Sequence, residues 1–302
     1  RLLCERVIAE MKTDSPIIAL NLISQLPYNA LYNKEELLEH VIALNRSESL
    51  YTRSSIPRAI FNLANKKDHI SHLNAVIRLM QLGINDKSSY VRKSVLEVLR
   101  DKCCDILSLP EVIQNFQIFL NDDSVIVRQI TFEIFAKLAE QNPLFVASYT
   151  RSAIQDAFFI IKHSPSIRET AKYTQTLPEL VNASRSMIKV YSAGFMDICI
   201  TLLTNPYPKL ENFMDIDSYN MILIGVTDSL SLLAPLDPPQ VYHYREIVIP
   251  LICDILLTNN KLDLSLSILK FFTNLLSAPS CTAQTSYREM TPIIFSACSK
   301  FL

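Results

Sequence analysis

Only a few residues of this 302-residue chain have types and spacings that could do chemistry. His69 and His72 stand three apart, a spacing that could turn both imidazoles toward a zinc ion from one helix face. Zinc needs further ligands, and no Cys or His pair stands nearby, so we interpret Asp68 and His69, at a helix start, as surface residues. Cys103 and Cys104 are adjacent, which is poor geometry for chelation or for a disulfide. The sequence therefore predicts no metal site.

Catalytic and nucleotide-binding motifs are also missing from the sequence. The three glycines, Gly83, Gly194 and Gly225, are scattered, whereas a phosphate-binding loop needs clustered glycines that let the backbone approach the phosphate. The kinase catalytic-loop and metal-binding motifs are absent, and so is a Gly-x-Ser-x-Gly elbow. We expect this segment to have no catalytic residue and to bind no cofactor of its own.

A recurring pair of charged residues is the strongest pattern. It consists of an Asp, a short polar turn, Val-Arg and then an apolar helical stripe, and it stands at Asp86–Arg92 and Asp122–Arg128. Weaker copies end at Arg53 and Arg168, so arginines at 53, 92, 128 and 168 follow at intervals of 39, 36 and 40. A period near forty with two helices per repeat is typical of HEAT or armadillo repeats.

We predict that these charges form a structural ladder between repeats rather than a row of ligand-binding arginines. A carboxylate in the turn favours the N-terminus of the following helix. The arginine can reach the carboxylate of a neighbouring turn as a fork, and for Arg128 the candidate partners are Asp86 and Asp122. The predicted ladder consists of Asp86, Arg92, Asp122, Arg128 and Arg168.

The hydrophobic pattern predicts about seven antiparallel helix pairs and one unpaired helix. The expected helices span 1–12, 15–26, 33–45, 49–64, 70–83, 88–104, 110–120, 124–141, 143–162, 165–183, 186–204, 218–234, 241–258, 261–277 and 286–302. Each pair has an apolar face that it cannot bury alone, so neighbouring pairs must stack. The predicted fold is an all-α HEAT-repeat solenoid, with repeats over 1–204 and again over 218–302.

One break interrupts this series, at residues 205–217. Two prolines followed by an acidic run predict an exposed loop there. Phe213, Met214 and Ile216 lie among the acidic residues, and apolar side chains in such a loop need something to cover them. The three residues are either a candidate protein contact or part of a flexible insertion.

Composition bounds the partners and the compartment. The formal net charge of −1 gives no global field that would attract nucleic acid or an anionic membrane. The longest apolar runs are shorter than a membrane span, and the run over 247–257 is interrupted by Asp254. Seven cysteines without paired spacing indicate small core residues in a reducing compartment. Because the chain begins at Arg1 and ends inside an apolar pattern, we expect a segment of a longer protein.

Three groups of residues resemble the amino-terminal HEAT region of target of rapamycin (TOR) kinases, over about residues 70–302. The first group is Leu82 to Asp86 with Val91-Arg92 and Val95-Leu96; the second is Leu120 to Asp122 with Val127-Arg128, Asn142-Pro143, Phe145-Val146 and Arg151; the third is Tyr287-Arg288, Pro292 and Phe301-Leu302. Val190-Tyr191 stands where that family tends to have Pro-Tyr, and several glycines and the tryptophans usual in the family are missing.

The resemblance implies a large serine/threonine kinase of the phosphatidylinositol-3-kinase-related class that controls growth in response to nutrients. Its kinase domain, which would bind ATP and magnesium, would lie far C-terminal of this segment. The segment itself would support the homodimer and dock the subunit that recruits substrates, so the implied partners are TOR complex subunits and a second copy of the parent. The implied location is the cytoplasm, with association to internal membranes through the complex.

A second interpretation is a HEAT-repeat adaptor or transport protein without a kinase domain, such as a karyopherin or a phosphatase scaffold. A free-standing enzyme is disfavoured because the motifs are missing. The parent gene distinguishes the first two interpretations, since only a TOR-like protein continues into a kinase domain.

Overall fold

The computed structural model describes residues 2–13, 15–65, 68–102, 104–204, 213–278 and 290–299. These residues form α-helices, short 3-10 helices and turns, and none of them lies in a β-strand. The predicted all-α class is confirmed. Contacts divide the chain into two compact units, Arg1–Ile134 and Phe135–Leu302, and the division falls inside one helix, α10 (Val125–Gln141).

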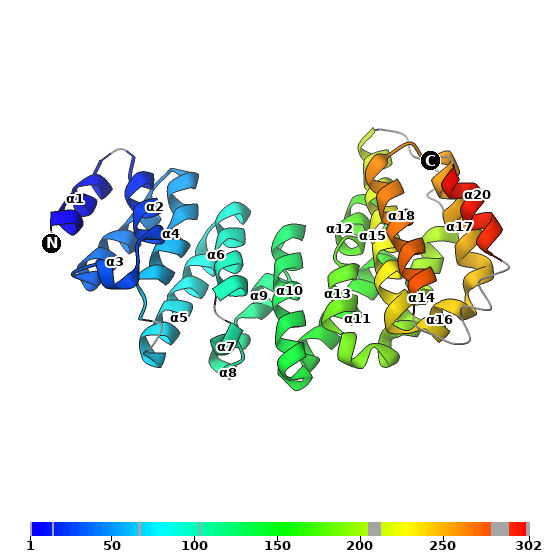
Figure 1. Ribbon diagram of the computed structural model, residues 1–302, viewed down its shortest axis with the longest axis horizontal. Coiled ribbons are helices and arrows are strands. Elements are labelled where there is room, and N and C mark those ends of the chain that lie inside the picture. The colour runs from blue at the N-terminus through cyan, green and yellow to red at the C-terminus, as the bar shows by residue number, and fades with distance from the viewer. Residues whose placement is uncertain are drawn as a thin grey trace. The chain divides into compact units, whose positions relative to one another are not determined.

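The first unit is a series of helical hairpins (Figure 1). Its helices before α10 are α1 (Leu2–Met11), α2 (Ile17–Gln25), α3 (Lys34–Ala43), α4 (Leu50–Leu63), α5 (His69–Asn85), α6 (Ser89–Lys102), α7 (Cys104–Leu107), α8 (Pro110–Ile113) and α9 (Phe116–Leu120). Consecutive helices pair as α1 with α2, α3 with α4 and α5 with α6. The second helices of these pairs, α2, α4 and α6, then pack side by side.

The second unit is organised around one long helix. Its elements are α11 (Ala147–His163), α12 (Ile167–Thr174), α13 (Leu177–Ala183), α14 (Ile188–Thr204), α15 (Phe213–Leu236), α16 (Pro238–His243), α17 (Arg245–Thr258), α18 (Leu262–Ser277) and α20 (Thr291–Cys298). α15 packs against α12, α13, α14 and α18. Gly225 lets α15 approach α12 closely, since a Cβ there would lie 2.5 Å from the carbonyl oxygen of Thr174.

Three predicted helices are divided in the structure. The helix expected over 165–183 is α12 and α13, because Pro178 has no N–H to donate and therefore occupies the first turn of a new helix. The helix expected over 110–120 is α8 and α9, and that over 241–258 is α16 and α17. By contrast, Pro57 lies inside α4 without ending it.

The predicted loop at 205–217 needs a partial correction. Residues 205–212 lie outside the described residues, but Phe213 to Asp217 are helical and form the first turns of α15. Asp215 lies in that first turn, where a carboxylate stabilises the positive end of a helix, so the acidic run that indicated a loop is compatible with a helix start.

Candidate interaction surfaces

A side-chain oxygen organises the turn before each of five helices, α4, α6, α10, α12 and α18. Asp86 accepts a hydrogen bond from the backbone N–H of Ser88 at 2.8 Å, and Asp122 accepts one from Ser124 at 2.9 Å. The same bond, from a backbone N–H to the side-chain oxygen two residues earlier, recurs in three further turns. There Ser49 donates to Ser47, Ser166 to Ser164 and Lys261 to Asn259. In all five turns the helix begins at the third residue after the acceptor. This local bond is why Asp, Asn or Ser stands at this position.

Arginines at the fourth position of α4 and α6 join successive turns. Arg92 donates from Nε and Nη2 to the two carboxylate oxygens of Asp122, each at 2.7 Å. Its Nη1 donates to the backbone carbonyls of Asp86 and Lys87 at 3.2 and 3.0 Å. Arg53 binds Asp86 in the same way, with Nε 2.8 Å from Oδ2. Each arginine therefore joins the turn before its own helix to the turn of the next repeat.

The charges around Arg92 reinforce one another. Its hydrogen bonds to Asp122 raise the pKa of the guanidinium, against the opposing effect of burial. Asp123 lies beside the pair, with one oxygen 2.6 Å from Nη2, yet 87% of its side chain is exposed. A hydrogen bond with Asp122 and the positive charge of Arg92 lower the pKa of Asp123. Since Arg92 and Asp122 are largely buried, this pair acts as a structural link between repeats.

Arg128 lies at the same helix position but binds differently from our prediction. The residue is 4% exposed, and its Nη1 donates to the backbone carbonyl of Asp122 at 2.6 Å. The carboxylates of Asp86 and Asp122, which we expected as its partners, bind Arg53 and Arg92 instead. Arg53 and Arg92, at the same position of α4 and α6, each reach forward to the aspartate of the next repeat.

Arg168 does not occupy the ladder position. It follows the turn acceptor Ser164 by four positions, whereas Arg92 follows the turn acceptor Asp86 by six. It is therefore the second residue of α12, and the buried Thr170 takes the fourth position. The side chain of Arg168 is 52% exposed and lies 3.7 Å from Asp215. The spacing between arginines alone could not reveal this shift. Counting residues from the turn acceptor would have revealed it.

The candidate protein contact is exposed on the first turns of α15. Phe213 is 76%, Met214 60% and Ile216 42% exposed. Charged residues of neighbouring elements border them: Lys261 lies 3.1 Å from Asp217, and its ammonium lies 5.9 Å from the centre of the Phe213 ring. The structure brings the three apolar residues together on a helix end; whether a partner covers them stays a prediction.

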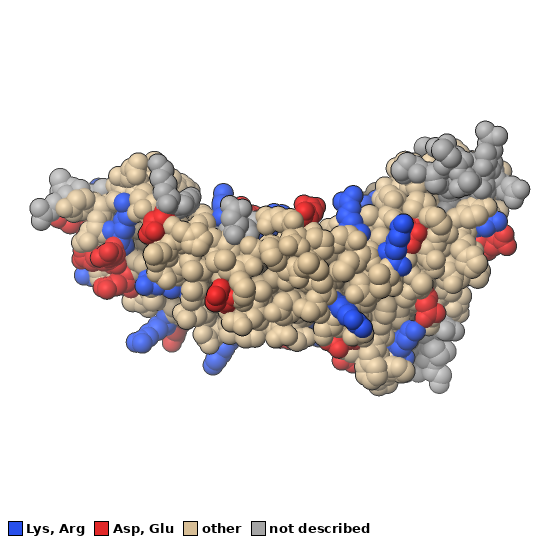
Figure 2. Space-filling model, turned by 90° about the horizontal axis from the view of Figure 1, so that it is seen from below, with Lys and Arg blue, Asp and Glu red and all other residues tan. Residues whose placement is uncertain are grey.

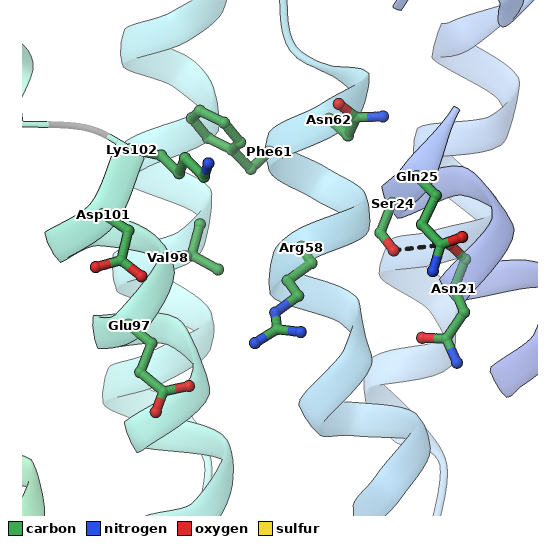
Figure 3. Close-up of a pocket in the computed structure, with 10 residues that line it drawn as sticks. All are labelled: Asn21, Ser24, Gln25, Arg58, Phe61, Asn62, Glu97, Val98, Asp101 and Lys102. Atoms are coloured by element: carbon green, nitrogen blue, oxygen red, sulfur yellow. Dashed lines mark hydrogen bonds between the residues drawn. The ribbon is translucent and has the colours of Figure 1, made fainter. Parts of the chain in front are cut away.

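Sequence reasoning missed a groove across α2, α4 and α6. It comprises two adjoining cavities of about 380 and 280 Å³, and Asn21, Arg58 and Glu97 line both. Figure 3 shows the larger cavity: Arg58 projects from α4 into the space before α6, Glu97 faces it from α6, and Asn21 and Gln25 face it from α2. Arg58 and Glu97 each stand eleven residues after a turn acceptor, Ser47 and Asp86. That common offset was the signal that could have found the groove.

Two basic side chains that line this groove, Arg58 and Lys102, have no partner among the residues that the structure describes. Glu97 lies 3.6 Å from Lys93, and Asp101 lies 2.9 Å from Arg100, so the acidic side chains of α6 have basic neighbours on the same helix. Arg58 is exposed and forms no hydrogen bond or ion pair with any residue that the structure describes. Beyond the groove, charges of both signs are interspersed over the face drawn in Figure 2.

The described residues contain no group of three or more His, Cys, Asp or Glu side chains placed to hold a metal ion. His72 packs edge-on against the ring of Phe61, with the ring centres 5.7 Å apart, and His69 is exposed at the start of α5. Burial raises the pKa of the Cys199 thiol to about 12 and that of Cys253 to about 11. These cysteines are therefore core thiols rather than reactive ones.

Two helical stretches, Arg185–Thr204 and Phe213–Leu236, have the length and apolar composition of a membrane span. A buried helix of a soluble core passes the same test, and α15 packs against α12, α13, α14, α16 and α18. These stretches are weak evidence for a membrane span.

Comparison with known proteins supports the repeat assignment. A family model described as a HEAT repeat associated with sister chromatid cohesion matches residues 104–130. The serine/threonine-protein kinase tor1 of Schizosaccharomyces pombe is 28% identical over 135 residues, which are 45% of this chain and 6% of that kinase. The chain thus spans a small part of this relative.

Solved structures of similar fold include Kap121p, Kap95p and importin beta. The crystal structure of Kap121p bound to Pho4p has a TM-score of 0.65 and 12% identity, covering 98% of this chain and 32% of that one. Kap95p, in its structure with RanGDP, has a TM-score of 0.63 and 14% identity, covering 98% and 38%. At such identities the likeness is one of fold alone. The chain is a HEAT/armadillo-like helical solenoid that also shares weak sequence similarity with a TOR kinase.

Proposed function

We propose that this chain is a scaffold segment of a TOR-like serine/threonine protein kinase that controls growth in response to nutrients. The observation that carries the proposal is the 28% identity to tor1 over 135 residues. The fold supports a non-catalytic role for the segment, because a stack of helical hairpins offers extended surfaces for protein partners. ATP and magnesium would be bound by the parent's kinase domain.

In this proposal the segment supports the dimer of the parent and docks subunits of the TOR complex. Two surfaces are available for such contacts, the α2–α4–α6 groove and the exposed first turns of α15. The parent would work in the cytoplasm and reach internal membranes through its complex. The likeness to Kap121p and Kap95p shows the fold alone, so no observation favours a transport role over the TOR-like one.

The test is to tag the endogenous protein, purify it under native conditions and identify the polypeptide that contains this segment. We expect a chain many times longer than 302 residues whose peptides include kinase motifs, together with co-purifying subunits. The purified complex should transfer phosphate from ATP, and an ATP-competitive kinase inhibitor should abolish the transfer. A short polypeptide without kinase motifs would overturn the proposal in favour of an adaptor or transport protein.

A further inference from the structure

A side chain of α4 ties this helix to α2 in the α2–α4–α6 groove. The amide of Asn62 on α4 donates to the backbone carbonyls of Ile23 and Leu26 at 2.7 and 2.6 Å, which fixes α4 against the end of α2. α4 and α6 pack along their length. Neighbouring helix axes lie about 8–10 Å apart, so a groove across three helices spans about 20 Å. An extended chain covers that distance with about six residues.

The serines of the groove are oriented to accept hydrogen bonds. Ser24 donates its hydroxyl proton to the carbonyl of Asn21, Ser55 to that of Tyr51 and Ser94 to that of Val91. Ser54 does the same within α4. Since each hydroxyl has one proton, these oxygens offer lone pairs to the groove. A bound molecule that donates N–H groups, such as a peptide backbone, matches them.

Arg58 adds a specific element to this surface. Its guanidinium projects into the groove, is exposed, and has no partner among the described residues. An arginine binds a carboxylate with two parallel hydrogen bonds, a geometry that lysine does not offer. The aromatic ring of Tyr90 lines the adjoining cavity and is half exposed, so an apolar side chain next to the carboxylate would have a ring to pack on.

From these features we infer that the groove binds an extended acidic segment of a protein partner, with a Glu or Asp carboxylate on Arg58. The segment's backbone N–H groups face Ser24, Ser54, Ser55 and Ser94, while the Asn21 and Gln25 amides can bind its carbonyls. Glu97 faces Arg58 and repels the incoming carboxylate, so it limits the affinity. The inference rests on the proposed scaffold role but needs no kinase domain.

The test uses the 302-residue chain and four pools of fluorescein-labelled decapeptides. The pools share a random mixture of Ala, Ser, Leu, Val and Tyr and differ only at a fixed central residue, which is Glu, Gln, Lys or phosphoserine. Fluorescence anisotropy at low salt gives the affinity of each pool. We expect the Glu pool to bind about fivefold more tightly than the Gln pool, as an exposed ion pair allows, and the Lys pool to bind most weakly. The preference should shrink as salt is added.

Variants assign the preference to the groove. Arg58→Gln should abolish the difference between the Glu and Gln pools. Arg78→Gln should preserve it, although Arg78 is also an exposed arginine that lines a cavity in the same unit. Glu97→Gln should tighten binding of the Glu pool about twofold, because it removes a like charge. Circular dichroism checks that each exposed substitution leaves the fold intact.

Several outcomes would overturn the inference: no difference between the Glu and Gln pools, a preference that survives Arg58→Gln, or no binding of any pool at about 1 mM protein. If the phosphoserine pool bound more than about tenfold more tightly than the Glu pool, the ligand of Arg58 would be a phosphate rather than a carboxylate. These measurements do not involve the parent protein, so the loss of the TOR-like proposal would leave their result unchanged.

Discussion

Arg92 of α6 donates two hydrogen bonds to the carboxylate of Asp122, through Nε and Nη2, each at 2.7 Å. The same carboxylate accepts a hydrogen bond from the backbone N–H of Ser124 at 2.9 Å and so organises the turn before α10. Asp122 therefore fixes the turn of its own repeat and also binds the arginine of the preceding repeat. Arg92 and Asp122 belong to neighbouring repeats, so their ion pair couples the two repeats.

This relationship predicts unequal effects on stability for Arg92→Ala and Asp123→Ala. Arg92→Ala leaves the largely buried carboxylate of Asp122 without its arginine and should lower the free energy of unfolding by about 2 kcal/mol. Asp123→Ala removes an exposed partner of the same arginine and should change it by less than about 0.5 kcal/mol. Urea unfolding followed by circular dichroism measures both. Equal losses in the two variants would show that Asp122 has no special role.

Arg168 provides a second test of the repeat register. Because it stands at the second position of α12 and is half exposed, Arg168→Ala should cost less than about 0.5 kcal/mol, well below the effect of Arg92→Ala. The same unfolding experiment applies. A loss as large as that of Arg92→Ala would restore Arg168 to the ladder and contradict the register.

The sequence made the repeat unit predictable because its signals are local. An Asp followed six residues later by Arg places the Asp in a turn and the Arg at the start of the next helix. Because this motif recurs in successive repeats, a link from the arginine of one repeat to the turn of a neighbouring repeat, such as Arg92–Asp122, could be anticipated. The prediction for Arg168 was wrong because an arginine can occupy the second or the fourth position of a helix. The distance from the turn acceptor decides between these positions. The groove was harder to foresee, since Asn21, Arg58 and Glu97 come from three hairpins and meet only when the helices stack.

Cys199 should be chemically silent in the folded chain. Burial raises the pKa of its thiol to about 12 from an ordinary value near 9, so hardly any reactive thiolate is present at neutral pH. Iodoacetamide at pH about 8 should modify the half-buried Cys298 and leave Cys199 unmodified until urea unfolds the chain, as mass spectrometry can show. Native labelling of Cys199 at the unfolded rate would mean that α14 is not packed as described.

The raised pKa of the Cys199 thiol also predicts how stability changes at alkaline pH. Above pH about 9 the unfolded chain releases the Cys199 proton while the folded chain keeps it, so the unfolded state binds fewer protons. The contribution of this group to stability should therefore fall as pH rises from about 9 toward 12. Cys199→Ala should show a smaller loss of melting temperature over that range than the unsubstituted chain. An identical loss in both would place the alkaline sensitivity elsewhere.

Two helical glycines should respond differently to the same substitution. Neither has a positive φ, so space rather than backbone conformation decides the outcome. At Gly225 an added Cβ would lie 2.5 Å from the carbonyl oxygen of Thr174 and 2.8 Å from its carbonyl carbon, and a backbone cannot move aside without shifting α12. Gly225→Ala should therefore lower the free energy of unfolding by about 1–3 kcal/mol.

Gly194 is the matched control for that substitution. An added Cβ there would lie 2.7 Å from a ring carbon of Phe158, which is a half-buried side chain and can turn away. The strain is offset in part by the better helix propensity of alanine, worth up to about 1 kcal/mol. Gly194→Ala should thus stay within about 1 kcal/mol of the unsubstituted chain in urea unfolding. If Gly225→Ala proved equally mild, the close approach of α15 to α12, on which the second unit is built, would be wrong.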